Sequence, residues 1–363
     1  MRRTLARAAA AAAAAIAALA LVPGSPAADV APGDMLATWP HPKGYVCYRA
    51  PGPVTIDGDL KAAEWDAAPW SDAFVDIEGD KRPKPRYRTR MKMLWDDEAL
   101  YIAAELEEPH VWATLKEHDA VIFQDPDFEV FLDPDGDNHT YGELELNALN
   151  TTWDLLLTKP YKDGGRALNG WEIIGLKTAV KVNGTLNDPR DTDTGWTIEI
   201  RWPWKGLREL ATFTGAPRDG DQWRINFSRV EWDVQVNGGQ SEKVKNRPEH
   251  NWVWAPQGVI DMHRPERWGY LQFSTAKPGT ATFKPDSDWP ARDALHRVYY
   301  AQRAFHKKHG KFAAAADLGL KDLADRLEVE TTRSGCEISW LDRGAQPPKR
   351  RYSITDDAHL RTR

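Results

Sequence analysis

The chain is poor in cysteine and in long apolar runs. Only two cysteines, Cys47 and Cys336, occur among 363 residues, which excludes a disulfide-rich scaffold and a cysteine-cluster metal site. His-Glu-x-x-His, P-loop, dinucleotide-binding and serine-nucleophile motifs are absent as well. The net charge is −6, from 48 basic and 54 acidic residues, so nucleic acid is not expected as the main partner. What remains is a soluble globular protein with enough chain to bury a sizeable core.

Residues 1–28 are predicted to be a secretory signal peptide. Three arginines come first, an apolar stretch of mostly alanine follows at 8–22, and small residues suited to cleavage stand at 25–27. An uncleaved membrane anchor is the alternative, although the apolar stretch is shorter than the ~20 residues of a spanning helix. We therefore expect an extracellular or periplasmic protein without a membrane span after cleavage. There Cys47 and Cys336 either pair or stay free.

The mature chain is predicted to be mainly β. Short strands separated by turn residues run from 45 to 275, and they include a hairpin at 90–106 and a second one from 128 to 148 around Asp133–Asn138. This spacing favours an immunoglobulin-like antiparallel β-sandwich. Residues 29–44 form a lead-in, and 276–288 are predicted to be a linker.

Residues 289–363 are predicted to form a small C-terminal α+β extension. Apolar residues recur at helical spacing from 291 to 309, Gly310 ends that helix, and short strands follow. The segment carries 15 basic and 10 acidic residues, whereas the rest of the mature chain is strongly acidic. A separate module docked on the acidic sandwich explains this asymmetry.

Five ordered blocks of the 45–275 region resemble the family 9 carbohydrate-binding modules and similar secreted proteins. The blocks are Val54–Leu60 leading into Glu64-Trp65, Leu94–Ala103, Phe128–Asp133, Gly195–Ile200 and Pro265–Leu271. The resemblance implies a DOMON-like sandwich of two antiparallel sheets that binds sugars without chemistry of its own. It also implies structural calcium, and no organic cofactor is expected.

The resemblance places a sugar site, but with several changed residues. The two tryptophans that clamp a sugar in relatives fall here at Phe123 and Met262. The strand glutamate is retained as Glu129 and a nearby asparagine as Asn147, whereas a positively charged partner is replaced by Glu145. The resemblance therefore implies the fold of the family more firmly than its sugar-binding site.

Aromatic residues outside these five blocks are the other ligand candidates. The chain has 17 Trp, 10 Tyr and 10 Phe, and an exposed aromatic face can stack on a sugar. Trp153, Trp252 and Trp254 are candidates, and alternation puts Trp252 and Trp254 on one face of a strand. A core role is the alternative for each of them. Four further tryptophans are assigned to the core: Trp65, Trp95, Trp196 and Trp223.

Asp133, Asp135 and Asp137 have the alternate spacing of oxygen ligands in a calcium loop. An EF-hand is excluded, because Asn138 stands where that loop needs glycine and Leu144 where it needs glutamate. Ca²⁺ is thus a candidate cofactor at this turn, and a solvated acidic hairpin turn is the alternative.

The leading hypothesis is an exported, non-catalytic carbohydrate-binding protein that recognises a sugar or the end of a polysaccharide. A second hypothesis is a protein-interaction scaffold whose lost site is covered by the helix at 291–310. Two further possibilities are a glycosidase using paired carboxylates and a haem protein using Met262 or His263.

Overall fold

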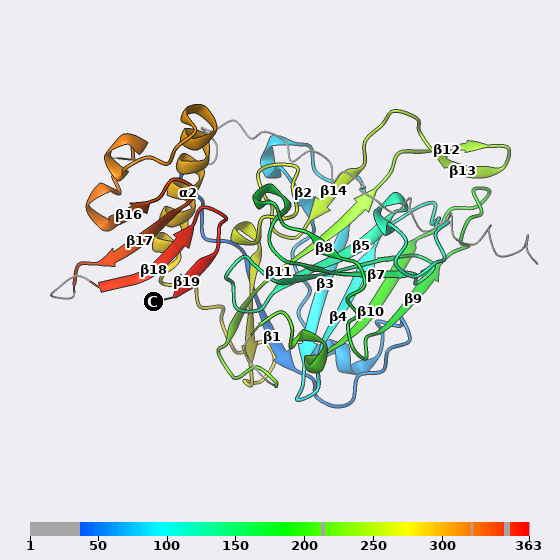
Figure 1. The fold of residues 1–363 in the computed structure, drawn as a ribbon. Coiled ribbons are helices and arrows are strands. Elements are labelled where there is room, and N and C mark those ends of the chain that lie inside the picture. Colours follow the sequence, from blue (N-terminus) through cyan, green and yellow to red (C-terminus); the bar gives the residue numbers. More distant parts are fainter. Residues whose placement is uncertain (1–36, 212–214, 321, 345–348, 363) are drawn as a thin grey trace, which may run out of the picture.

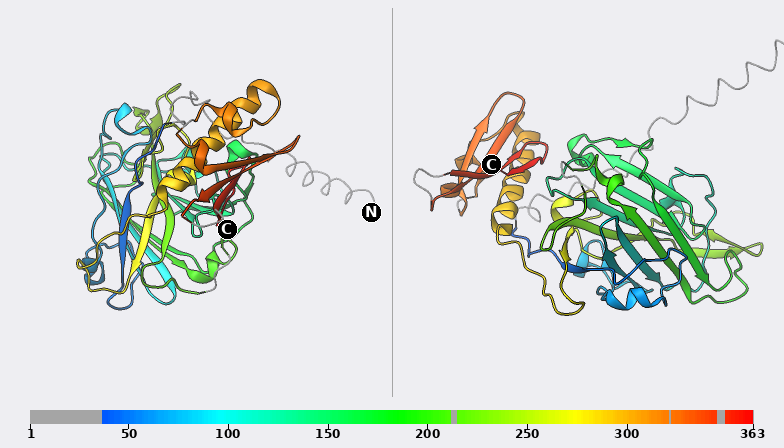
Figure 2. Two further views of the ribbon diagram at one scale, coloured as in Figure 1. Left: turned by 90° about the vertical axis from the view of Figure 1, so that its left-hand side faces the viewer. Right: turned by 90° about the horizontal axis from the view of Figure 1, so that it is seen from below.

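The computed structural model describes residues 37–211, 215–320, 322–344 and 349–362. The predicted signal peptide and the first half of the lead-in lie outside these residues. The described chain forms a large β-structure with a smaller lobe beside it (Figures 1 and 2). No helix of these residues is long and apolar enough to cross a membrane.

The large β-structure is one strongly curled sheet of thirteen strands. Its order is β8-β7-β6-β5-β11-β15-β1-β3-β4-β10-β9, with β14 beside β11 and β2 beside β14. The strand bounds are β1 Gly44–Arg49, β2 Val75–Asp76, β3 Thr89–Trp95, β4 Ala99–Leu106, β5 Asp127–Asp133, β6 Tyr141–Asn147, β7 Thr152–Leu157, β8 Ala167–Leu168, β9 Lys177–Asn183, β10 Gly195–Pro203, β11 Gln222–Glu231, β14 His250–Val253 and β15 Gly269–Ser274. A separate hairpin joins β12 (Val234–Asn237) and β13 (Gln240–Lys243).

The curled sheet brings its two halves together across one hydrophobic core. Apolar side chains from β3, β4 and β10 meet those from β5, β6 and β7 in a single cluster. The four tryptophans assigned to the core, at 65, 95, 196 and 223, are at most 5% exposed. The predicted β-sandwich is therefore confirmed. Most neighbouring strands are antiparallel, whereas β1 pairs in parallel with β15 and β3.

Both predicted hairpins are present. Trp95 pairs with Leu100 across the β3–β4 turn, and Glu129 pairs with Glu145 between β5 and β6. Short 3-10 helices connect the strands: η1 Ala63–Ala67, η2 Gly79–Lys81, η3 Ile122–Gln124, η4 Tyr161–Asp163, η5 Trp204–Leu207, η6 Pro265–Arg267, η7 Ala315–Leu318 and η8 Ala324–Arg326.

The smaller lobe contains the helix α2 (Trp289–His309) and a four-stranded sheet, β16-β17-β18-β19. Its strands are β16 Leu327–Thr331, β17 Cys336–Asp342, β18 Lys349–Thr355 and β19 Leu360–Thr362. Gly310 follows α2 with φ +66°, the left-handed conformation in which glycine is strongly favoured at helix ends. The lobe has its own hydrophobic cluster, which includes Leu295 and Ile338.

Polar contacts hold the lobe against the sandwich. The Leu360 amide donates to the Asp137 carbonyl at 3.0 Å, and Arg303 Nη1 pairs with Asp163 at 2.5 Å. The predicted linker is also held in place, because the Tyr48 hydroxyl donates to the Ala281 carbonyl at 3.1 Å. Cys47 and Cys336 are free, buried thiols that lie in the two separate hydrophobic clusters.

Candidate functional site

A cavity of about 420 Å³ lies on the sheet formed by β5, β6 and β7. It occupies the face opposite the central core, because Val130 and Leu132 point into that core while Glu129 and Phe131 point into the cavity. We call it the carboxylate pocket. Its lining residues are Ile77, Phe123, Glu129, Phe131, Glu143, Glu145, Trp153, Leu155, Tyr161, Lys162, Val230, Glu249, Asn251, Ile260, Asp261, Met262 and His263.

The register of β5, β6 and β7 determines which side chains form the floor of the carboxylate pocket. Glu129 faces Glu145 and Phe131 faces Glu143 between β5 and β6, and Glu145 faces Trp153 between β6 and β7. Because side chains alternate along a strand, these directly opposed residues share one face of the sheet. Glu129, Glu143 and Glu145 therefore line one face of the sheet together.

The floor is strongly acidic and its carboxyl groups are little exposed. Glu129, Glu143 and Glu145 are at most 5% exposed, and Asp127, just below them, is fully buried. Burial raises the pKa of Glu129 to about 7. Burial, and then the neighbouring carboxylates, raise the pKa of Asp127, Glu143 and Glu145 well above the usual range. A cation, or a group that donates hydrogen bonds to the floor, would relieve this repulsion.

Two of these carboxylates keep a free oxygen. Glu143 Oε2 and Asp127 Oδ2 are buried without a hydrogen-bond partner. Glu145 Oε2, in contrast, accepts from the Phe123 amide at 3.0 Å. The cation that lines the pocket, Lys162, is paired with Asp163 at 3.2 Å, so it does not neutralise the floor.

Aromatic rings form the walls. Phe123 and Trp153 stack with ring centroids 6.4 Å apart and an angle of 27° between their planes. Tyr161 is 40% exposed and packs edge-on against His263 with centroids 4.5 Å apart. Burial lowers the pKa of His263 to about 4, which leaves that ring neutral at pH 7. Half-exposed rings beside hydrogen-bonding groups are the features that a sugar ring needs.

The structure brings together five of the eight predicted ligand residues. Phe123, Glu129, Glu145, Trp153 and Met262 all line the carboxylate pocket. Sequence reasoning missed Tyr161, which follows Pro160 in a short helical turn. No strand alternation marks such a residue, so only its exposed aromatic character could have suggested it.

Trp252 and Trp254 lie elsewhere, and their prediction as exposed stacking residues is wrong. They share one face, as expected, but that face is the interior one. Both rings are at most 3% exposed in the central core, and Val253 between them faces the outer cluster under the pocket. Trp252 packs edge-on against Tyr87.

Asn147 is also separate from the pocket. Its buried amide donates to the Leu115 carbonyl at 2.9 Å and to Asp125 Oδ2 at 3.0 Å. The first contact is to the loop that precedes η3 and the second is to the residue that follows it. Asn147 thus supports Phe123 from a distance instead of lining the cavity.

The turn that carries Asp133, Asp135 and Asp137 lies at the junction of the sandwich and the smaller lobe. One oxygen of each carboxylate lies within 4.8 Å of the others, a donor set that suits a hard cation. Burial, and then the charges of Asp135 and Asp137, raise the pKa of Asp133, and burial raises that of Asp135 to about 6. However, the Gly136 and Asn138 amides already donate to Asp133 at 2.9 Å.

A second cavity of about 490 Å³ lies beside β4, β9 and β10. Five of its six charged lining residues are paired with each other. Arg88 pairs with Glu105 at 2.9 Å, and Lys181 pairs with Asp59 at 2.9 Å. It therefore offers fewer free polar groups than the carboxylate pocket.

Comparison with known proteins identifies the family. The model for the carbohydrate family 9 binding domain-like family matches residues 56–274. Among solved structures, the chain is similar to a family 9 carbohydrate-binding module from Caldicellulosiruptor kristjanssonii in complex with cellotriose. That structure is 16% identical with a TM-score of 0.43, and the match covers 67% of this chain and 100% of that one.

A Bacteroides uniformis protein proposed to bind carbohydrate is also 16% identical, with a TM-score of 0.48 and coverage of 64% and 100%. No curated protein matches the chain. Because the family model spans more than half of the residues, the protein belongs to the carbohydrate family 9 binding domain-like family.

Proposed function

We propose that this protein is an exported, non-catalytic carbohydrate-binding protein and that the carboxylate pocket holds the sugar. The observation that carries this proposal is the pairing of partly exposed rings, Phe123 and Trp153, with hydrogen-bonding carboxylates in one cavity. The C–H face of a pyranose stacks on the rings, while its hydroxyls donate to Glu129 and Glu145.

The scaffold hypothesis required the helix at 291–310 to cover these rings. Among the described residues, no residue of α2 or of the later strands lines the carboxylate pocket. The helix instead contacts the outer side of η4, where the Tyr299 hydroxyl donates to Asp163 at 2.5 Å. The smaller lobe thus supports the pocket wall and leaves the cavity open.

A glycan array followed by calorimetry on the mature protein tests the proposal. We expect saturable 1:1 binding to at least one glycan and no hydrolysis of that glycan during the titration. If correctly folded protein binds no plant, algal or bacterial glycan, the proposed function is wrong. Release of free sugar from the bound glycan would contradict the non-catalytic part.

We also propose that Ca²⁺ binds the Asp133–Asp137 turn and stabilises the fold. Saturation at 100 times the Kd adds about 2.7 kcal/mol. Thermal unfolding in calcium should therefore occur on the order of 5 °C higher than in chelator. Asp135→Asn should remove this gain, whereas Asp72→Asn, an exposed carboxylate paired only with Lys43, should keep it. Equal melting temperatures with calcium and with chelator would contradict the proposal.

A further inference from the structure

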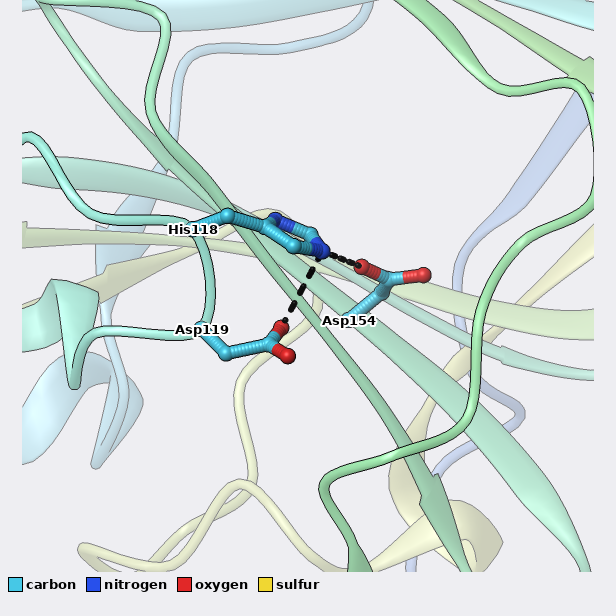
Figure 3. Close-up of side chains that lie close together, drawn as sticks. All are labelled: His118, Asp119 and Asp154. Atoms are coloured by element: carbon cyan, nitrogen blue, oxygen red, sulfur yellow. Dashed lines mark ion pairs between the residues drawn. The ribbon is translucent and has the colours of Figure 1, made fainter.

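A cluster outside the carboxylate pocket combines one imidazole with several carboxylates. His118 and Asp119 lie in the loop before η3, and Asp154 is carried by β7 on the face opposite Trp153. Figure 3 shows the His118 ring directed at both aspartates. Glu172 approaches the same nitrogen from a third segment. We call these four residues the His118 cluster.

The distances within the His118 cluster match those between ligands of one small ion. His118 Nε2 lies 3.4 Å from Asp119 Oδ1, 3.8 Å from Asp154 Oδ1 and 3.2 Å from Glu172 Oε1. With Zn–N and Zn–O bonds of 2.0–2.1 Å, tetrahedral ligands stand about 3.4 Å from one another. Ligand atoms of His118, Asp119 and Asp154 all lie within 4.8 Å of one another.

The hydrogen bonds around the cluster orient its donor atoms. His118 Nδ1 lies 3.0 Å from the Thr152 carbonyl, which fixes the proton on Nδ1 and directs the Nε2 lone pair at the carboxylates. Metal-binding histidines are commonly held in this way. Asp154 Oδ2 accepts from the Ile173 amide at 2.6 Å, so Oδ1 is the oxygen left for a ligand.

Asp154 provides an observation that an ion pair alone does not explain. Its side chain is only 2% exposed, and its Oδ1 has no hydrogen-bond partner. Asp119 Oδ1 is likewise buried without a hydrogen-bond partner. A protonated imidazole has one Nε2–H for three converging carboxylates, whereas a divalent cation can serve all of them.

We propose that the His118 cluster binds one Zn²⁺ ion. Imidazole and carboxylate together suit zinc better than calcium, which takes oxygen ligands. The ion would join the loop before η3, the strand β7 and the segment at Glu172. The strand β7 carries Trp153, and the loop leads directly into η3, which carries Phe123. Zinc would therefore stiffen the aromatic wall of the carboxylate pocket.

Calorimetry on mature protein freed of metal tests this site. We expect 1:1 binding of ZnCl₂ with a Kd in the micromolar range or below, and a higher melting temperature. His118→Gln and Asp154→Asn should each weaken zinc binding at least tenfold. His250→Gln is the matched control, because His250 is another partly exposed ring paired with an aspartate, Asp233, at 3.1 Å.

Co²⁺ gives an independent readout of the same site. Bound at the His118 cluster, it should show the intense visible absorption of tetrahedral cobalt, and His118→Gln should abolish that band. The proposal is overturned if no stoichiometric zinc binding occurs, or if binding survives unchanged in both the His118 and the Asp154 variants.

The unpaired carboxylates on the floor of the carboxylate pocket bear on which sugar it would bind. The floor of the carboxylate pocket holds Glu129, Glu143 and Glu145 with no cation paired to them among the described residues, and buried Glu143 Oε2 has no hydrogen-bond partner. Oxygens of Asp127, Glu129 and Glu145 lie within 4.8 Å of one another. Buried charges are normally paired, because an isolated one is costly.

We infer that the pocket prefers a sugar bearing a free primary amine, whose ammonium group would pair with this floor. This inference rests on the proposed function. The ammonium donates three hydrogen bonds, which matches several convergent carboxylate oxygens. The sugar ring would keep its stacking contact with Trp153.

Titration with matched oligosaccharides in chelator tests the inference. We expect an oligomer of glucosamine to bind at least tenfold more tightly than its N-acetylated and its neutral glucose counterparts. Glu143→Gln should reduce that preference, and Glu242→Gln, an exposed control, should not. Equal binding of all three sugars overturns the amine preference and leaves the proposed function intact, whereas binding of none of them, nor of any array glycan, removes both.

Discussion

Replacing both Phe123 and Trp153 with alanine should lower the affinity for the glycan by about 100-fold. Each ring contributes roughly 1–1.5 kcal/mol of stacking, and every 1.4 kcal/mol changes the Kd about tenfold. The fold should survive, since the contacts of Phe123 that secure η3 belong to its backbone. Its amide donates to Glu145 at 3.0 Å, and its carbonyl accepts from the Trp232 indole at 3.0 Å. Calorimetry measures the change.

Trp70→Ala is the matched control for this prediction. Trp70 is a partly exposed tryptophan beside the second cavity, where its ring lies under Arg90 and Lys92. Affinity should be unchanged in this variant. If Trp70→Ala loses binding while the Phe123/Trp153 variant keeps it, the ligand occupies the second cavity and our assignment of the site is wrong.

Glu199→Ala should destabilise the sandwich by roughly 3–5 kcal/mol. Glu199 is fully buried, and its carboxylate accepts three hydrogen bonds. The Asp57 and Gly58 amides donate at 2.7 Å, and the Trp65 indole donates at 2.6 Å. Truncation leaves these donors without an acceptor. Thermal unfolding should therefore occur roughly 10 °C or more below the wild-type temperature.

Glu199→Gln separates the hydrogen bonds from the charge. Its amide oxygen can accept two of the three bonds, so its melting temperature should fall between those of the wild type and of Glu199→Ala. A Glu199→Ala protein that unfolds within 2 °C of wild type would show that these donors find other partners.

The sheet region was largely predictable from the sequence, because strand alternation carries local information. The β5–β6 hairpin follows from apolar residues at alternate positions on both sides of an Asp-Pro-Asp-Gly turn. This pattern also places Glu129 and Glu145 on one face, and the strand register confirms it.

Which face of a strand is buried could not be predicted in the same way. Alternation correctly groups Trp252 with Trp254, but it does not say which side of β14 meets the core. That choice depends on β14 packing between β11 and β2, which is a long-range arrangement. The bulkier face was buried, as the hydrophobic effect favours for two indole rings.

A site whose residues come from distant segments cannot be predicted from the spacing of residues in one sequence. His118, Asp154 and Glu172 form no spaced motif, and they meet only because β7 passes beside two loops. The smaller lobe illustrates the same point. Its helix was predictable from spacing, whereas the contact of Arg303 with Asp163 behind the pocket wall was not.

Hydrogen exchange of the mature protein with and without its glycan tests the central claim most directly. A bound sugar should slow exchange in the segments that build the carboxylate pocket, at 121–131, 141–161 and 249–263, because local opening there then costs more free energy. Slower exchange confined to the second cavity, at 59–61, 105–107 and 181–197, would contradict the account.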